Sequence, residues 1–128
     1  MDEVPLVVVD AANVVGSVPD GWWRDRRAAT ERLLDRLELV LTEGLVGGPE
    51  PPFDLVAVVE GAARTVAARD GVRVVPAGGS GDDAIVEVVR AAGADRSRLV
   101  VTADRELRNR VEALGASVVG PRAVRRTR

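Results

Sequence analysis

A chain of 128 residues, 46% hydrophobic and 30% charged, has the length and composition of one globular domain that buries a core without cross-links. It contains no His, Cys, Lys or Tyr, which excludes an imidazole base, a thiolate, a catalytic or P-loop lysine and a phenol. The net charge of −2 and the pI near 5.2 do not indicate a protein that coats nucleic acid through bulk charge.

No apolar run approaches the roughly 18 residues that a membrane-spanning helix needs. The first five residues lack the basic region and the long apolar stretch of a secretory signal. We therefore expect a cytoplasmic protein with no membrane partner, and a homodimer is one open alternative for its assembly.

Short valine-rich runs alternate with longer charged segments of helical period, a pattern typical of a parallel sheet covered by helices. This predicts an α/β fold. In chain order, with boundaries good to about 2 to 4 residues, we expect a strand at 5–9, a helix at 23–43, strands at 54–59 and 72–76 with a short helix at 62–69 between them, a helix at 82–92, a strand at 98–102, a helix carrying Leu107 and Val111, and a strand at 117–119.

One domain is expected over residues 1–121. The arginine-rich residues 122–128 should form a frayed tail after Pro121. All eighteen basic residues are arginine, whose planar fork suits phosphate, although a coding bias is the favoured explanation for the absence of lysine.

Acidic residues stand where the predicted strands end. Asp10, Glu60 and Asp104 follow three of the strands, and Asp82 and Asp83 open a helix after the glycine-rich residues 78–81. In a parallel sheet, ligands bind outside the carboxyl ends of the strands. Carboxylates that converge there repel one another unless a cation lies among them, and hard oxygen ligands favour Mg²⁺ or Mn²⁺.

Each acidic residue also has an ordinary structural explanation. Asp10 alone could be a turn residue and Asp104 a helix cap, but several carboxylates at matching strand ends favour a site. Glu60 is the weaker candidate because Gly61 beside it marks a turn. Ser80 and Asp82 are both suitable N-caps for the helix expected at 82–92. Of Asp82 and Asp83, one should cap the helix and the other face the site. Asp83 is the expected site residue because Glu87 lies one turn further along the same face.

Four further residues are candidates for substrate binding. Asn13 could hold a water or a phosphate oxygen, or could be a turn residue with left-handed backbone. Of the tryptophan pair at 22–23, we expect one buried and one exposed, with Trp22 available to stack on a base. Arg64 and Arg105 are best placed to meet a phosphate, although a solvated helix face explains Arg105 equally well.

Three segments, Val9–Gly16, Gly81–Val86 and Val101–Leu107, resemble the NYN branch of the PIN-like nuclease superfamily. They are most similar to its small bacterial YacP-like group, in which an Asp-x-x-Asn opening, a mid-chain Asp pair and a late Thr-x-Asp occur in this order. The resemblance spans almost the whole chain. It implies a Rossmann-like PIN-type sheet of order 3-2-1-4-5 and a Mg²⁺- or Mn²⁺-dependent ribonuclease that acts on RNA.

Carried over position by position, the resemblance implies metal binding by Asp10, Asp83 and Asp104, with Asn13 and Glu60 in support. Asp82 is the remaining candidate ligand beside Asp83. Many members of the superfamily have a further acidic residue on the helix after the first strand, and Glu38 or Glu43 would have to take that place here.

The leading hypothesis is an endoribonuclease that uses water as the nucleophile and leaves a 5′-phosphate. Two other functions remain open: a non-catalytic RNA-binding module of the same fold, and a phosphohydrolase acting on free nucleotides.

Overall fold

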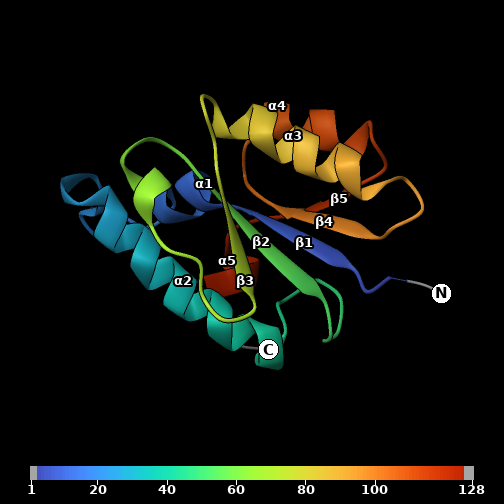
Figure 1. The fold of residues 1–128 in the computed structure, drawn as a ribbon, viewed down its shortest axis with the longest axis horizontal. Helices are drawn as coiled ribbons and strands as arrows, with labels where there is room; N and C mark the ends of the chain where they lie inside the picture. The colour runs from blue at the N-terminus through green and yellow to red at the C-terminus, as the bar shows by residue number, and fades with distance from the viewer. Residues whose placement is uncertain (1–2, 126–128) are drawn as a thin grey trace.

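The computed structural model describes residues 3–125 as a five-stranded parallel sheet in the order β3-β2-β1-β4-β5, with helices on both faces (Figure 1). The α/β class and the sheet order implied by the resemblance are therefore confirmed. The elements are β1 (Leu6–Asp10), α1 (Ala11–Gly16), η1 (Trp22–Arg24), α2 (Arg26–Glu43), β2 (Asp54–Val59), η2 (Gly61–Thr65), β3 (Val72–Pro76), α3 (Gly81–Ala92), β4 (Arg98–Val101), α4 (Arg105–Glu112), β5 (Ser117–Val119) and α5 (Arg122–Arg125).

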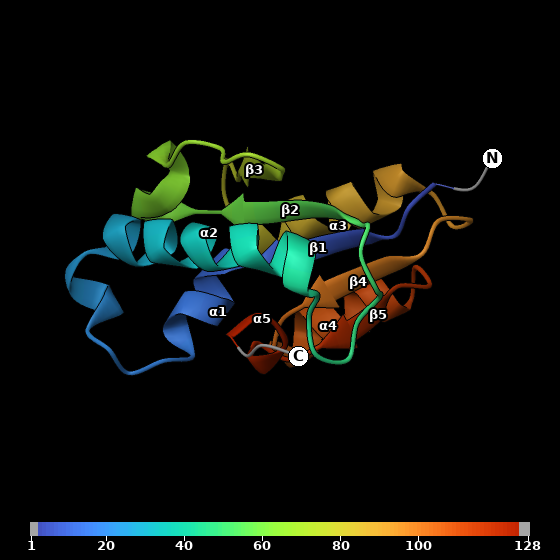
Figure 2. The same cartoon turned by 90° about the horizontal axis from the view of Figure 1, so that it is seen from below.

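Alternate strand residues supply two separate cores. Val7 and Val9 of β1 pack with α1, α2 and α5, whereas Leu6 and Val8 pack with α3 and α4 on the opposite face (Figure 2). Since both faces of the sheet are covered, the central strands are continuous runs of apolar residues. This is why the strand positions could be predicted to within a residue or two.

The register brings the carboxyl ends of three strands to one edge of the sheet. Val9 of β1 is level with Ala57 of β2 and with Val101 of β4. The chain leaves β1 and reaches β2 on one side and β4 on the other, so the strand order reverses at β1. A crevice for ligands is expected at such a point.

Two helices differ from the sequence prediction, one in its presence and one in its first residue. Helix α1 starts directly after β1, where the sequence predicted no helix, and among residues 3–125 only glycines have positive φ, so Asn13 is not left-handed. A helix of six residues is too short to show a helical period. The helix expected at 23–43 is divided, because Asp25 accepts a hydrogen bond from Ala28 N and caps a new helix, α2, after η1.

The segment after Pro121 does not fray at its start. Residues 122–125 form α5, and the Val124 side chain is fully buried. Arg36 Nε donates to Val124 O at 3.0 Å, and Val46 N donates to Ala123 O at 3.1 Å. The first part of the predicted tail thus belongs to the folded domain, while Arg126 and Arg128 lie outside the described residues.

Within residues 3–125, every helix is too short or too polar to cross a membrane.

Candidate active site

Four carboxylates from different elements gather at the carboxyl edge of the sheet. Asp10 and Glu60 continue the alternation of Val8 and Val58, so they point to the face covered by α3 and α4. The amino ends of α3 and α4 bring Asp82 and Asp104 to this same face. We call Asp10, Glu60, Asp82 and Asp104 the acidic cluster.

Asp10 is the buried member of the acidic cluster, with 5% of its surface exposed. Thr102 Oγ1 donates to its Oδ2 at 2.8 Å, and Asn13 N donates to its Oδ1 at 3.4 Å. Burial raises the pKa of Asp10 to about 6; the two hydrogen bonds oppose this shift, and the charges of Asp82 and Glu60 add to it. Asp10 is therefore an acid that titrates close to neutral pH.

Thr102 connects two members of the acidic cluster. Its hydroxyl donates to Asp10 and accepts a hydrogen bond from Asp104 N at 3.1 Å. The Asp104 carboxylate accepts from Leu107 N at 2.9 Å and so caps α4, as one of the sequence alternatives expected. Its second oxygen accepts no hydrogen bond within residues 3–125, which leaves it available to a ligand.

Glu60 is held by the backbone of α3. Its Oε2 accepts a hydrogen bond from Gly81 N at 2.8 Å, and a Cβ atom at position 81 would overlap that oxygen. Gly81 is thus a positioning residue that the sequence did not reveal, because the glycine-rich stretch 78–81 reads only as a flexible loop.

The sequence analysis expected Asp83 to face the site, but in the structure Asp82 does so instead. The pKa of Asp82 is raised by burial and by the charges of Asp104 and Glu60, so it is Asp82 that lies among the other carboxylates. The Asp83 side chain is 74% exposed and forms a 3.0 Å ion pair with Arg110 of α4. Neighbouring helical positions diverge by about 100°, so only one of the two can face the sheet edge.

The expected support from Glu87 is also corrected, and of the two N-cap candidates the structure has Ser80 rather than Asp82. Glu87 pairs with Arg90 on the same helix, and the N-cap of α3 is Ser80, whose Oγ accepts from Asp82 N at 3.1 Å. Nothing in the sequence indicated that Arg110 would pair with Asp83, because its approach to α3 depends on how α3 and α4 pack. Its charge lowers the pKa of Asp82 and offsets part of the repulsion there.

Neither Glu38 nor Glu43 joins the acidic cluster. Glu38 pairs with Arg69 at 3.1 Å, and Glu43 pairs with Arg36 at 3.6 Å.

In the part of the chain that the structure describes, no three acidic side chains form a ready-made metal group. The acidic cluster nevertheless consists only of carboxylates, and burial together with their mutual repulsion raises the pKa values of Asp10 and Asp82. This donor set suits a hard divalent cation such as Mg²⁺ or Mn²⁺.

The candidate substrate residues surround this edge in different ways. Asn13 Oδ1 accepts from Ala103 N at 2.8 Å, so its amide joins α1 to the loop after β4. Arg105 is exposed and forms no ion pair within residues 3–125, and Arg64 is exposed and donates only to Gly61 O, at 3.3 Å. Trp23 is 55% exposed and Trp22 is half-buried, so one tryptophan is exposed as expected but neither is fully buried.

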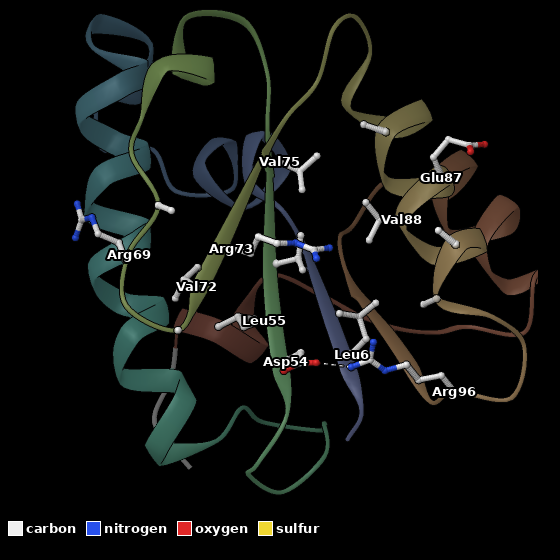
Figure 3. Close-up of a pocket in the computed structure, with 16 residues that line it drawn as sticks. Leu6, Asp54, Leu55, Arg69, Val72, Arg73, Val75, Glu87, Val88 and Arg96 are labelled. Carbon is white, nitrogen blue, oxygen red and sulfur yellow. Dashed lines mark hydrogen bonds and ion pairs between the residues drawn. The ribbon is translucent and has the colours of Figure 1, made fainter. Parts of the chain in front are cut away.

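A larger hollow of about 970 Å³ lies away from the acidic cluster, at the amino ends of the strands (Figure 3). Its lining includes Leu6, Val72 and residues of α3, and an ion pair joins two further lining residues, Asp54 and Arg96. No member of the acidic cluster lines it, so its size does not make it the active site.

Neither a family model nor a curated protein sequence matches the chain. Among solved structures, its fold is similar to that of Rae1 (YacP) from Bacillus subtilis, with a TM-score of 0.70 and 16% sequence identity. The match covers 93% of this chain and 70% of that chain. At this identity the likeness establishes a common fold, and YacP is also the name of the group that the sequence motifs resemble.

Proposed function

We propose that this chain, which has the fold of Rae1 (YacP), is a metal-dependent ribonuclease that hydrolyses RNA phosphodiester bonds at the acidic cluster. One observation carries the proposal: the fold brings Asp10, Glu60, Asp82 and Asp104 to one edge of the sheet although their charges repel, and after burial this repulsion contributes to the raised pKa values of Asp10 and Asp82. Such an arrangement costs stability, and carboxylates with perturbed pKa values are typical of functional sites.

In this proposal Asp10, Asp82 and Asp104 hold Mg²⁺ or Mn²⁺, with Glu60 in support. When bound, the ion offsets negative charge on the scissile phosphate and makes a water nucleophile available near neutral pH. Thr102 fixes the orientation of Asp10 through its hydroxyl. The side-chain nitrogen Nδ2 of Asn13, which donates no hydrogen bond within residues 3–125, is free to bind a phosphate oxygen, and Arg105 and Arg64 are exposed for neighbouring phosphates.

The test is cleavage of an end-labelled single-stranded RNA by the purified protein with Mn²⁺ or Mg²⁺. We expect internal cuts that EDTA abolishes, and we expect Asp104→Asn to lower the rate by about a hundredfold or more, since losing a ligand costs at least as much as losing its supporting partner. If neither ion supports cleavage, the proposal is wrong. RNA binding that survives chelation would then indicate a non-catalytic module, and release of phosphate from nucleoside triphosphates a phosphohydrolase.

Adjacent aspartates provide a matched pair of variants. Asp82→Asn should lower RNA cleavage at least about tenfold, whereas Asp83→Asn, which changes an exposed ion pair with Arg110, should retain most of the activity. The reverse ranking would show that Asp83 is the ligand and that our assignment of Asp82 is mistaken.

A further inference from the structure

A second, smaller pocket opens beside the acidic cluster, on the face of the sheet covered by α1 and α2. Its volume is about 250 Å³, and its walls come from α1, η1, the start of α2 and the segment where β2 passes into η2. The sequence named Trp22 as a residue that could stack on a base, but it could not reveal a pocket, because four separate segments form it.

The pocket and the acidic cluster share the end of β2 and the end of β1. Glu60 lines the pocket and is itself a member of the acidic cluster, and Ala11, another lining residue, directly follows Asp10. The pocket therefore opens at the same carboxyl edge of the sheet as the acidic cluster, on the other face of β1 and β2.

The walls suit a flat aromatic ring. Val15, Val59 and Ala63 supply apolar surface, and Trp22 supplies an indole. The exposed guanidinium of Arg26 also lines the pocket and lies 5.4 Å from the centre of the Trp22 ring. Pockets for whole drug-sized ligands begin at roughly 300 Å³, so this smaller one has room for a single ring system.

We propose that this pocket binds one unpaired nucleobase next to the phosphate that is cut, and that Trp22 and Arg26 recognise it. The inference rests on the proposed ribonuclease function and specifies its substrate as single-stranded RNA. A base can enter such a pocket only after it leaves its stack and its partner, which unpaired RNA allows at low cost. Arg26, with its charge at the rim, is placed to contact the backbone phosphate of the same nucleotide.

The test measures binding in EDTA, where cleavage does not interfere. With Trp23→Phe as background, Trp22 is the single tryptophan of the chain and reports directly on the pocket. We expect a short single-stranded oligoribonucleotide to change the fluorescence of Trp22, and the same strand annealed to its complement to bind at least about tenfold more weakly.

Filling the pocket should remove this binding. Ala12 is exposed and lines the pocket, so Ala12→Leu should occupy it without disturbing the core, and should lower affinity for the single strand by about tenfold or more. Ala91→Leu is the matched control: it is the same change at an exposed helical position, but in the distant hollow of Figure 3. Thermal melting should show both variants folded, and Arg26→Gln gives an independent second perturbation of the pocket.

The outcomes separate this inference from the proposed function. If Ala12→Leu and Arg26→Gln bind the single strand as tightly as Ala91→Leu does, or if the duplex binds equally well, the pocket does not bind a base, even where Mn²⁺ supports cleavage. If single-strand binding depends on the pocket but no ion supports cleavage, the base pocket stands and the ribonuclease proposal fails.

Discussion

Asp10 ends β1 at a position where a charged side chain is costly. Its neighbours Val8 and Val9 are fully buried, and its own hydrogen-bond partners are Thr102 and the backbone of Asn13. These two bonds are too few to compensate for burial, so the protonated form is favoured up to about pH 6 in the absence of a cation. A bound divalent ion would favour the ionised form instead.

This predicts a pH-dependent stability that a single substitution removes. The pKa of Asp10 is about 6 in the folded protein against an ordinary value of 3.8, so its contribution to stability is fully present below pH 3.8 and is lost as the pH rises through 6. The difference corresponds to about 3 kcal/mol. In urea unfolding with EDTA, the stability of Asp10→Asn relative to the unsubstituted protein should therefore rise by up to about this amount between pH 4 and pH 7. Parallel pH profiles for the two proteins would show that Asp10 titrates normally.

At the scale of elements, the amino end of α3 sets the shape of the site. The loop after β3 ends at Ser80, which caps the helix, and Gly81 N then binds Glu60. The helix in this way presents Asp82 inward and Asp83 outward towards Arg110 of α4. A small change in this turn should therefore move two members of the acidic cluster.

Alanine at position 81 provides a test of that connection. Because its Cβ would overlap Glu60 Oε2, the flexible Glu60 side chain must move, and we expect Gly81→Ala to lower RNA cleavage about tenfold and to raise the Mn²⁺ concentration required. Gly79→Ala is the matched control, since a Cβ there meets nothing within 4 Å. The two variants should have similar melting temperatures. Equal cleavage rates in the two would show that the contact between Gly81 and Glu60 has no role in the reaction.

At the scale of the molecule, the order of the strands assembles the site. Residues as far apart in the chain as Asp10 and Asp104 meet because β1 and β4 are neighbours, and helices on the two faces hold the carboxyl edge in place. Helix α5 completes the layer with α2 through the buried Val124. Folding and ion binding should therefore be linked, since the unfolded chain does not bring these carboxylates together.

That linkage should be visible in thermal melting. Mn²⁺ at a free concentration of 100 times its Kd should stabilise the protein by about 2.7 kcal/mol, which for a domain of this size raises Tm by roughly 10 °C. Asp104→Asn should reduce the increase, and sodium chloride of equal ionic strength should not reproduce it. An unchanged Tm across the Mn²⁺ titration would argue against an ion at the acidic cluster.

Much of this architecture could be read from local patterns. The valine runs mark all five strands, because a parallel sheet with both faces covered needs continuous apolar residues, and the strand ends put Asp10, Glu60 and Asp104 at one edge. Helix α1 and helix α5 were missed because six and four residues are too few to show a period. Metal binding and RNA cleavage by these residues stay predictions that the experiments above test.

The sequence by itself determined the available chemistry, since a chain without His, Cys, Lys or Tyr has carboxylates and arginines as its reactive groups, and it determined where the sheet would lie. Only the tertiary structure decided that Asp82 rather than Asp83 faces the edge, that Gly81 holds Glu60, and that four segments enclose a pocket beside Trp22. The physical reason is that a periodic pattern reports which residues are buried. The rotation of a helix against a sheet, which decides where each polar side chain points, depends on the packing of the whole core.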